Sequence, residues 1–223
     1  MKLNKDYWEN KYHLNEIGWD IGTVSTPLKE YIDQIENKEL KILIPGAGNG
    51  YEFEYLYNAG FQNVFVIDIA KTPLENIQTR MPHLDDKHLI HKDFFELSDT
   101  FDLIIEQTFF CAIAPDLRKK YVSKMDSLLN SGSKIVGLLF QFPLTEKGPP
   151  FGGNENEYRV LFENQFNIKT LETAHNSIKP RENNELFFIF EKKYNLCHKI
   201  LYSLIRKLNI KSSGLPIKSM KLL

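Results

Sequence analysis

The segment KILIPGAGNGYEF constrains the fold of this chain more than any other part of the sequence. Its apolar first half predicts a buried strand at residues 40–44, and the strand leads directly into Gly46, Gly48 and Gly50. Glycines allow a tight turn and a close approach of the backbone to a ligand, because they have no Cβ. A strand, a glycine-rich loop and a helix in this order predict an α/β sheet with a nucleotide site at the end of that strand.

Short apolar runs alternate with longer amphipathic stretches along most of the chain. The runs predict seven strands, at residues 40–44, 64–68, 88–91, 101–106, 134–140, 168–174 and 186–191. Helices are expected between them at residues 26–36, 51–59, 73–81, 115–129 and 155–165. This alternation is typical of a mostly parallel sheet with helices on both faces.

The last two predicted strands are joined by residues 175–185, which are polar and too few for a crossover helix. Strands joined without a crossover pair as an antiparallel hairpin. We therefore expect a Rossmann-like, seven-stranded, mostly parallel sheet with an antiparallel last strand. By analogy of fold, this is the class I methyltransferase arrangement.

The spacing of the glycines separates two kinds of nucleotide site. The loop reads G-x-G-x-G, and Tyr51 stands where a dinucleotide-binding loop carries its third glycine. Asp68 ends the next strand, 22 residues after Gly46, where a carboxylate can accept hydrogen bonds from both ribose hydroxyls. That role would serve an adenosine cofactor or NAD; alternatively, Asp68 caps the following helix.

The segment HLIHKDFFEL brings two further residues to the end of the third strand. The carboxylate of Asp93 can accept from an adenine amino group, and the ring of Phe94 can line the base. Taken alone, Asp93 would be a solvated loop acid. Its position after the strand favours a nucleotide over a dinucleotide.

Four segments occur in a fixed order: YWENKYHLNEIGWDIG, LIPGAGNGYEF, FDLIIEQTFFCAIAPDLRKKY and GPPF. Over residues 7–192 the chain resembles the thiopurine methyltransferase superfamily, and within it the branch of thiol, thiocyanate and halide methyltransferases. The resemblance implies an enzyme that uses S-adenosyl-L-methionine. Its small-molecule acceptor would be a soft nucleophile: a thiol, thiocyanate, a halide or a related sulfur or selenium anion.

The resemblance also implies a set of cofactor contacts. They are Trp8, Tyr12, Trp19, Gly46, Gly48, Asp68, Asp93, Phe94 and Gln107. Tyr12 replaces the tryptophan usual in the family, and Gln107 stands where the plant branch carries tyrosine. The three aromatic residues near the start are expected to cover the sulfonium, since ring faces attract cations. Glu106 either faces the methionine amino group or caps the next turn.

Methyl transfer from a sulfonium is a direct displacement, so the protein aligns the two reactants and no catalytic residue is assigned. The pocket candidates are aromatic or small. They are Phe109, Phe110, Cys111, Phe140, Phe142, Pro149, Pro150 and Phe151, with Phe110, Phe142 and Phe151 foremost. Arg181 either meets an anionic substrate or pairs with Glu182 at the surface.

Three other functions stay open at this point. A thiopurine or aryl-thiol methyltransferase would use the same fold with a larger acceptor pocket. A non-catalytic nucleoside-binding module would retain the cofactor site without turnover. A dehydrogenase is the more distant alternative, because the glycine spacing is against it.

The charges are balanced overall, with 28 Lys and Arg against 29 Asp and Glu and a net charge of -1. This gives no basic face for a nucleic acid. Residues 192–223 nevertheless hold eight Lys or Arg and no acid. We expect a methyltransferase domain at residues 1–193 and a basic amphipathic helical tail at residues 194–223. The tail would contact an anionic membrane surface, an acidic partner or the acidic body of the chain itself, or fray in solution.

The remaining composition bears on location and metals. The chain begins with polar and aromatic residues rather than the apolar run of a signal peptide, and no run approaches the roughly 18 apolar residues of a membrane span. Its 2 cysteines and 6 histidines lack the spacing of metal ligands. We expect a cytoplasmic monomer without a metal site.

Overall fold

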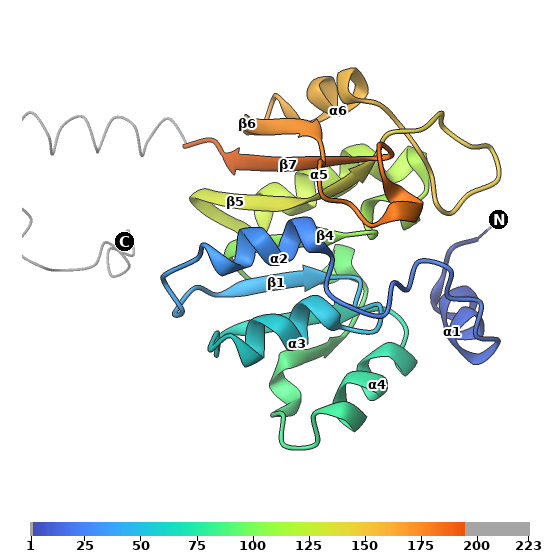
Figure 1. The fold of residues 1–223 in the computed structure, drawn as a ribbon, viewed down its shortest axis with the longest axis vertical. Helices are drawn as coiled ribbons and strands as arrows, with labels where there is room; N and C mark the ends of the chain where they lie inside the picture. The colour runs from blue at the N-terminus through green and yellow to red at the C-terminus, as the bar shows by residue number, and fades with distance from the viewer. Residues whose placement is uncertain (1, 195–223) are drawn as a thin grey trace, which may run out of the picture. The chain divides into compact units, whose positions relative to one another are not determined.

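The structure is a computed structural model that describes residues 2–194. These residues form one seven-stranded sheet of order β3-β2-β1-β4-β5-β7-β6 (Figure 1). The strands are β1 (Ile42–Pro45), β2 (Val64–Asp68), β3 (Leu89–His91), β4 (Phe101–Gln107), β5 (Leu129–Phe140), β6 (Phe166–Thr173) and β7 (Glu185–Lys192). Strands β1 to β5 pair in parallel, whereas β7 runs antiparallel to both β5 and β6. The predicted fold class and terminal hairpin are confirmed.

Six α-helices accompany the sheet within the described residues. They are α1 (Lys5–His13), α2 (Thr26–Asp33), α3 (Tyr51–Asn58), α4 (Thr72–Arg80), α5 (Arg118–Ser127) and α6 (Glu155–Phe162). Five short 3-10 turns join them, namely η1 (Asp86–His88), η2 (Phe94–Glu96), η3 (Phe110–Ala112), η4 (Pro115–Leu117) and η5 (Lys179–Arg181). None of these helices is long and apolar enough to cross a membrane.

The core consists of two apolar layers, one on each face of the sheet. Helices α2, α3 and α4 contribute to one layer, with Phe53 as a fully buried member. Helices α5 and α6 contribute to the other, with Tyr121 and Phe162. Within β1, Leu43 faces the second layer and Ile44 the first, as alternation along a strand requires. Both faces are therefore buried, which explains the uninterrupted apolar strands.

The helix expected at residues 115–129 and the strand expected at 134–140 differ from the structure. The helical region begins as η4 and ends at Ser127, and β5 starts five residues early, at Leu129. Leu129 pairs with Phe101, and Gly132 takes a positive φ of 80° where the strand is irregular. The polar sequence NSGS resembles a turn, but a bulge accommodates it inside the strand.

Helix α1 has no counterpart among the predicted helices. Its N-cap is Asn4, whose side chain accepts from the Tyr7 amide at 3.1 Å. The helix contains no fully buried residue, so it lacks the apolar stripe that reveals a helix in a sequence. It lies at the carboxyl end of β1 (Figure 1). The predicted helical tail at 194–223 lies outside the described residues except for Tyr194, so the domain boundary stays a prediction.

The packing at Gly137, in the middle of β5, generates a stability prediction. A Cβ at this position would lie 2.4 Å from the Glu106 carbonyl oxygen and 2.9 Å from Phe188 Cε1. Because backbone cannot move aside, we expect Gly137→Ala to lower the free energy of unfolding by about 1–3 kcal/mol in urea denaturation. Gly18→Ala is the control, since nothing lies within 4 Å of its Cβ. Equal stabilities of the two variants would contradict this packing.

Candidate active site

A cavity of about 760 Å³ lies at the carboxyl ends of β1, β2 and β4. Its lining comes from the loops after these strands and after β3, from the first nineteen residues, from the segments around residues 111–117 and 149–150, and from Phe140 and Arg181. This is the edge at which open α/β sheets bind ligands. All nine predicted cofactor contacts line the cavity: Trp8, Tyr12, Trp19, Gly46, Gly48, Asp68, Asp93, Phe94 and Gln107.

The glycine loop after β1 uses two of its glycines for different purposes. Gly46 and Gly48 both have positive φ values, 74° and 53°, which L side chains rarely adopt. A Cβ on Gly46 would come within 2.6 Å of the Phe109 ring, whereas one on Gly48 would meet nothing within 4 Å. Gly46 thus permits close packing of two loops, and Gly48 leaves open space beside the cavity.

The carboxylate of Asp68 ties this loop to the end of β2. One oxygen accepts from the Ala47 amide and the other from the Ala70 amide, each at 2.8 Å. Burial raises the pKa of Asp68 to about 6, although these hydrogen bonds act to lower it. Each oxygen retains a second acceptor site, so Asp68 can still accept from two ligand hydroxyls.

The turn after β3 brings Asp93 and Phe94 to the cavity beside the end of β2. The strand itself ends at His91, and Asp93 caps η2 by accepting from the Phe95 amide at 2.8 Å. Phe94 packs edge-on against Phe109, with ring centroids 5.1 Å apart. The second Asp93 oxygen and the Phe94 ring remain available on the cavity side.

Two residues at the end of β4 have features that cost free energy: Gln107, the last residue of the strand, and Thr108, which follows it. The Gln107 side-chain oxygen is buried and has no hydrogen-bond partner among the described residues. Thr108 has a φ of 57°, in the left-handed region that costs energy for a β-branched residue. An unsatisfied buried acceptor and local strain, both at one cavity wall, indicate a site built to receive a donor group.

Glu106 points away from the cavity and resolves an alternative left open by the sequence. Its carboxylate accepts from the amides of Phe109 and Phe110 at 2.8 and 3.0 Å, and from the Tyr121 hydroxyl at 2.6 Å. It therefore caps the turn η3 and does not line the cavity. Complete burial raises its pKa to about 7, although the Tyr121 hydroxyl and the two amides act to lower it.

The aromatic residues near the start of the chain form a cluster over the cavity. The Trp19 ring lies edge-on to those of Trp8 and Tyr12, with both centroid distances 5.7 Å. Tyr12 thus supplies the aromatic surface that the family's tryptophan would. We call residues 4–25, which carry these rings, the lid.

Hydrogen bonds to the β1–β2–β3 half of the sheet anchor the lid. Glu9 accepts from the Thr72 hydroxyl at 2.6 Å and from the Lys71 amide, at the first turn of α4. Farther along, Asp20 accepts from the Asn49 amide group, and buried Glu52 accepts from the Ser25 amide at 3.1 Å. These contacts fix the lid to α4, to the glycine loop and to α3.

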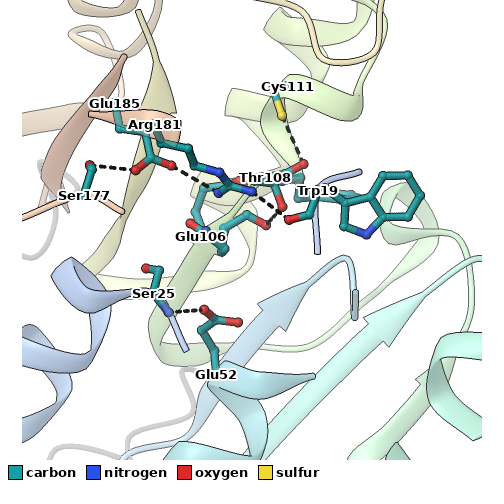
Figure 2. A network of polar contacts seen from close by, with 11 residues as sticks. Trp19, Ser25, Glu52, Glu106, Thr108, Cys111, Ser177, Arg181 and Glu185 are labelled. Carbon is teal, nitrogen blue, oxygen red and sulfur yellow. Dashed lines mark hydrogen bonds and ion pairs between the residues drawn. The ribbon is translucent and has the colours of Figure 1, made fainter. Parts of the chain in front are cut away.

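Arg181 anchors the lid from the opposite half. Its guanidinium donates to the Trp19 carbonyl at 2.7 Å and pairs with Glu185 at 3.2 Å (Figure 2). The prediction that Arg181 pairs with Glu182 at the surface is wrong: η5 buries the side chain and aims it at Glu185, four residues on. Arg181 also lines the cavity.

Most of the remaining wall of the cavity is apolar. We call this apolar part the acceptor wall, and it consists of Cys111, Ala112, Ile113, Ala114, Leu117, Phe140, Pro149 and Pro150. The exposed side chain of Asp116 lines the cavity beside it. Cys111 donates to the Thr108 carbonyl at 3.2 Å, and burial raises the pKa of its thiol. Since a protonated thiol is a poor nucleophile, Cys111 is a packing residue here.

The three foremost pocket candidates do not line the cavity. Phe110 is in the core against Tyr121 and Phe162, while its neighbour Phe109 faces the cavity. Phe142 is held in a bridge to Gly153, and the Phe151 amide donates to the Cys111 carbonyl at 2.8 Å. Phe142 and Phe151 therefore support the acceptor wall from behind, and Pro149 and Pro150 form its surface.

The comparisons with known proteins bear directly on this site. The sequence model of the family described as thiopurine S-methyltransferase matches residues 3–199. The chain belongs to the thiopurine S-methyltransferase family. It is accordingly an S-adenosylmethionine-dependent methyltransferase, as the sequence predicted.

Two relatives and one solved structure illustrate the similarity. The probable thiol methyltransferase 2 of Arabidopsis thaliana is 27% identical over 184 residues, covering 80% of this chain and 81% of that protein. A thiopurine S-methyltransferase of Vibrio cholerae is 28% identical over 174 residues, covering 70% and 80%. The fold is shared by the 1,6-didemethyltoxoflavin-N1-methyltransferase of Burkholderia thailandensis, solved with S-adenosylhomocysteine: TM-score 0.67, 15% identity, covering 85% of this chain and 87% of that one.

The residues present in this methyltransferase fit its cofactor. Asp68 offers acceptors to ribose hydroxyls, and the unpaired Gln107 oxygen offers one to a charged amino group. The aromatic lid offers ring faces to a sulfonium. When bound, S-adenosylmethionine supplies an electrophilic methyl group.

The buried carboxylate of Glu106 generates a prediction on stability and pH. Its pKa is raised on folding, so the folded state binds the proton more tightly, and stability falls as pH rises from about 4.5 to about 7. We expect Glu106→Gln to remove this part of the pH dependence, with a slope of at most about 1.4 kcal/mol per pH unit. Urea denaturation between pH 4.5 and 8 measures it. Exposed Glu172→Gln is the control, and parallel curves for wild type and Glu106→Gln would contradict the prediction.

Proposed function

We propose that this enzyme methylates small, soft, anionic acceptors: thiolates, thiocyanate, halides or related sulfur and selenium anions. The observation that carries the proposal is the composition of the acceptor wall: among the described residues its side chains are apolar, and the one charged side chain beside it, that of Asp116, is exposed to solvent. A polarisable anion needs no hydrogen-bonding side chain, because transfer to a sulfonium methyl neutralises its charge and a dry pocket favours that loss.

We infer that the cofactor lies between the glycine loop and the lid. Asp68 would accept from the ribose hydroxyls, and Asp93 with Phe94 would hold the adenine. The methionine amino group would donate to Gln107, which relieves the unpaired oxygen. Trp8, Tyr12 and Trp19 would cover the sulfonium and exclude water.

The cavity residues indicate that the acceptor arrives already deprotonated. No histidine lines the cavity among residues 2–194. Of the acids that line it, Asp68 and Asp93 receive backbone hydrogen bonds, Glu16 pairs with Lys11, and Asp116 is exposed to solvent. A general base must lie within hydrogen-bond reach of the proton it removes. The chain therefore aligns the nucleophile and leaves ionisation to the acceptor's own chemistry.

A thiopurine or aryl thiol is the second candidate, and the family name favours it. The cavity volume of about 760 Å³ is in the usual range for a drug-sized ligand. The cofactor is itself a ligand of about this size, so its binding would leave limited room in the cavity for a purine or aryl ring system as acceptor. Purine ring nitrogens would also find no free donor on the acceptor wall, since Arg181 already serves Trp19 and Glu185.

The partner of this site is a small molecule. The monomeric state, the cytoplasmic location and the absence of nucleic-acid binding stay predictions from the sequence. So does a weak contact of the basic tail at residues 194–223 with a membrane surface or with the body of the chain.

The proposed ribose contact generates a binding prediction. We expect Asp68→Ala to weaken binding of S-adenosylhomocysteine about 10- to 100-fold, because hydrogen bonds to a carboxylate are lost. Isothermal titration calorimetry measures the dissociation constant, and circular dichroism reports the fold. Asp99→Ala is the control, since Asp99 pairs with Lys41 outside the cavity. Unchanged affinity of Asp68→Ala would remove Asp68 from the site.

The proposed acceptor class generates a prediction on turnover. We expect release of S-adenosylhomocysteine with thiocyanate, iodide, hydrosulfide and thiophenol, and a lower kcat/KM with a thiopurine. For thiols the rate should rise with pH through the acceptor's own pKa, whereas the thiocyanate rate should not share this rise. A thiopurine preferred over every small anion would overturn the acceptor class, and a labelled-methyl assay negative for all acceptors would favour a non-catalytic nucleoside-binding module.

A further inference from the structure

Arg181 occupies a position that neither the cofactor contacts nor the acceptor wall explains. The side chain is 8% exposed and reaches the Trp19 carbonyl from a residue 162 positions later in the chain. Its charge is balanced by Glu185, which is 2% exposed and receives a further hydrogen bond from the Ser177 hydroxyl at 2.7 Å (Figure 2). We call the contacts of Arg181 with Glu185 and with the Trp19 carbonyl the Arg181 bridge.

The bridge differs from the other lid anchors in the part of the sheet that it uses. Glu9, Asp20 and Ser25 all attach to α3, α4 or the glycine loop, which belong to the β1–β2–β3 half. Arg181 belongs to the connection between β6 and β7, at the other end of the sheet. The lid is therefore attached on both sides of the cavity, and on the second side by Arg181.

The bridge holds Trp19, whose ring contacts both other aromatic rings of the lid. Trp19 packs against both Trp8 and Tyr12, so its backbone position sets the arrangement of all three rings. A charged donor to a backbone carbonyl is among the stronger hydrogen bonds, and burial strengthens it. The two-armed guanidinium holds Glu185 with one nitrogen and the Trp19 carbonyl with the other. A lysine has no such fork.

We propose that Arg181 is a positioning residue that holds Trp19 over the cofactor side of the cavity, with Glu185 as the charge that keeps the guanidinium in place. This inference rests on the cofactor position proposed above. The bridge couples the terminal hairpin to the lid, and the Arg181 guanidinium also lies over the ring of Phe140 in the acceptor wall, 5.5 Å from its centroid. Loss of the bridge would leave the fold intact and free the lid on the hairpin side, while the contacts of Glu9, Asp20 and Ser25 hold its other side.

The chain contains 2 tryptophans, Trp8 and Trp19. The experiment uses the full chain with Trp8→Phe, so that all tryptophan fluorescence comes from Trp19. In this background, Arg181→Lys retains a cation beside Glu185, and the double variant Arg181→Met with Glu185→Leu removes the buried pair together. Replacing both partners by apolar groups is often neutral for stability, whereas removing one is costly. We expect both variants to unfold in urea near the parent, to expose Trp19 to acrylamide quenching, and to bind S-adenosylhomocysteine about tenfold more weakly.

Arg159→Met is the matched control, because Arg159 forms the same i,i+4 pair with Glu155 on the surface of α6. It should change neither quenching nor affinity. Parental quenching and affinity in Arg181→Lys or in the folded double variant would overturn the proposal; if the double variant does not fold, Arg181→Lys decides alone. Both readouts work without an acceptor, so they are independent of the acceptor class. If Asp68→Ala leaves affinity unchanged, quenching without ligand still reports on the bridge.

Discussion

The carboxylate of Asp68 is the contact on which the site depends. By accepting from Ala47 and Ala70 it joins the loop after β1 to the turn after β2, so that the ends of two parallel strands share one acidic group. Burial of the acid at this junction removes solvent from it and raises its pKa to about 6, although the two backbone hydrogen bonds act to lower it. A ligand that donates two hydroxyls would restore part of the lost solvation. The geometry that shapes the loop therefore also creates the demand for a ligand.

A second buried acid, Glu106, also accepts backbone hydrogen bonds, but it holds the turn after β4 and does not line the cavity. Its carboxylate accepts hydrogen bonds from the amides of Phe109 and Phe110 and from the Tyr121 hydroxyl, and these bonds fix the turn that follows β4. The neighbouring Gln107 lines the cavity, and its buried side-chain oxygen has no hydrogen-bond partner within residues 2–194. Glu106 and Gln107 are adjacent in β4, and because side chains alternate along a strand, the first lies in the core and the second at the cavity.

The sequence predicts the parts of this site that depend on local patterns. Gly46 and Asp68 each follow a recognisable strand, so their positions at the cavity could be predicted. Phe109 and Phe110 could not be distinguished, because which ring faces the cavity depends on the positive φ of Thr108 and on the bonds of Glu106. The partner of Arg181 was missed for a similar reason: the short turn η5 decides between Glu182 and Glu185. Helix α1 buries no residue fully and leaves no periodic apolar signal.

The two halves of the cavity differ in polarity, and the lid contacts both of them. In the proposed site, the cofactor half would recognise a polar ligand through fixed acceptors: Asp68, Asp93 and the Gln107 oxygen. The acceptor wall offers shape and low polarity, which suits an anion that loses its charge on reaction. A lid held only from the cofactor side could cover the sulfonium and still admit water beside the acceptor wall. On the role proposed for Arg181, its attachment on the far side would remove that freedom, and this would account for a charge pair buried at the end of the sheet.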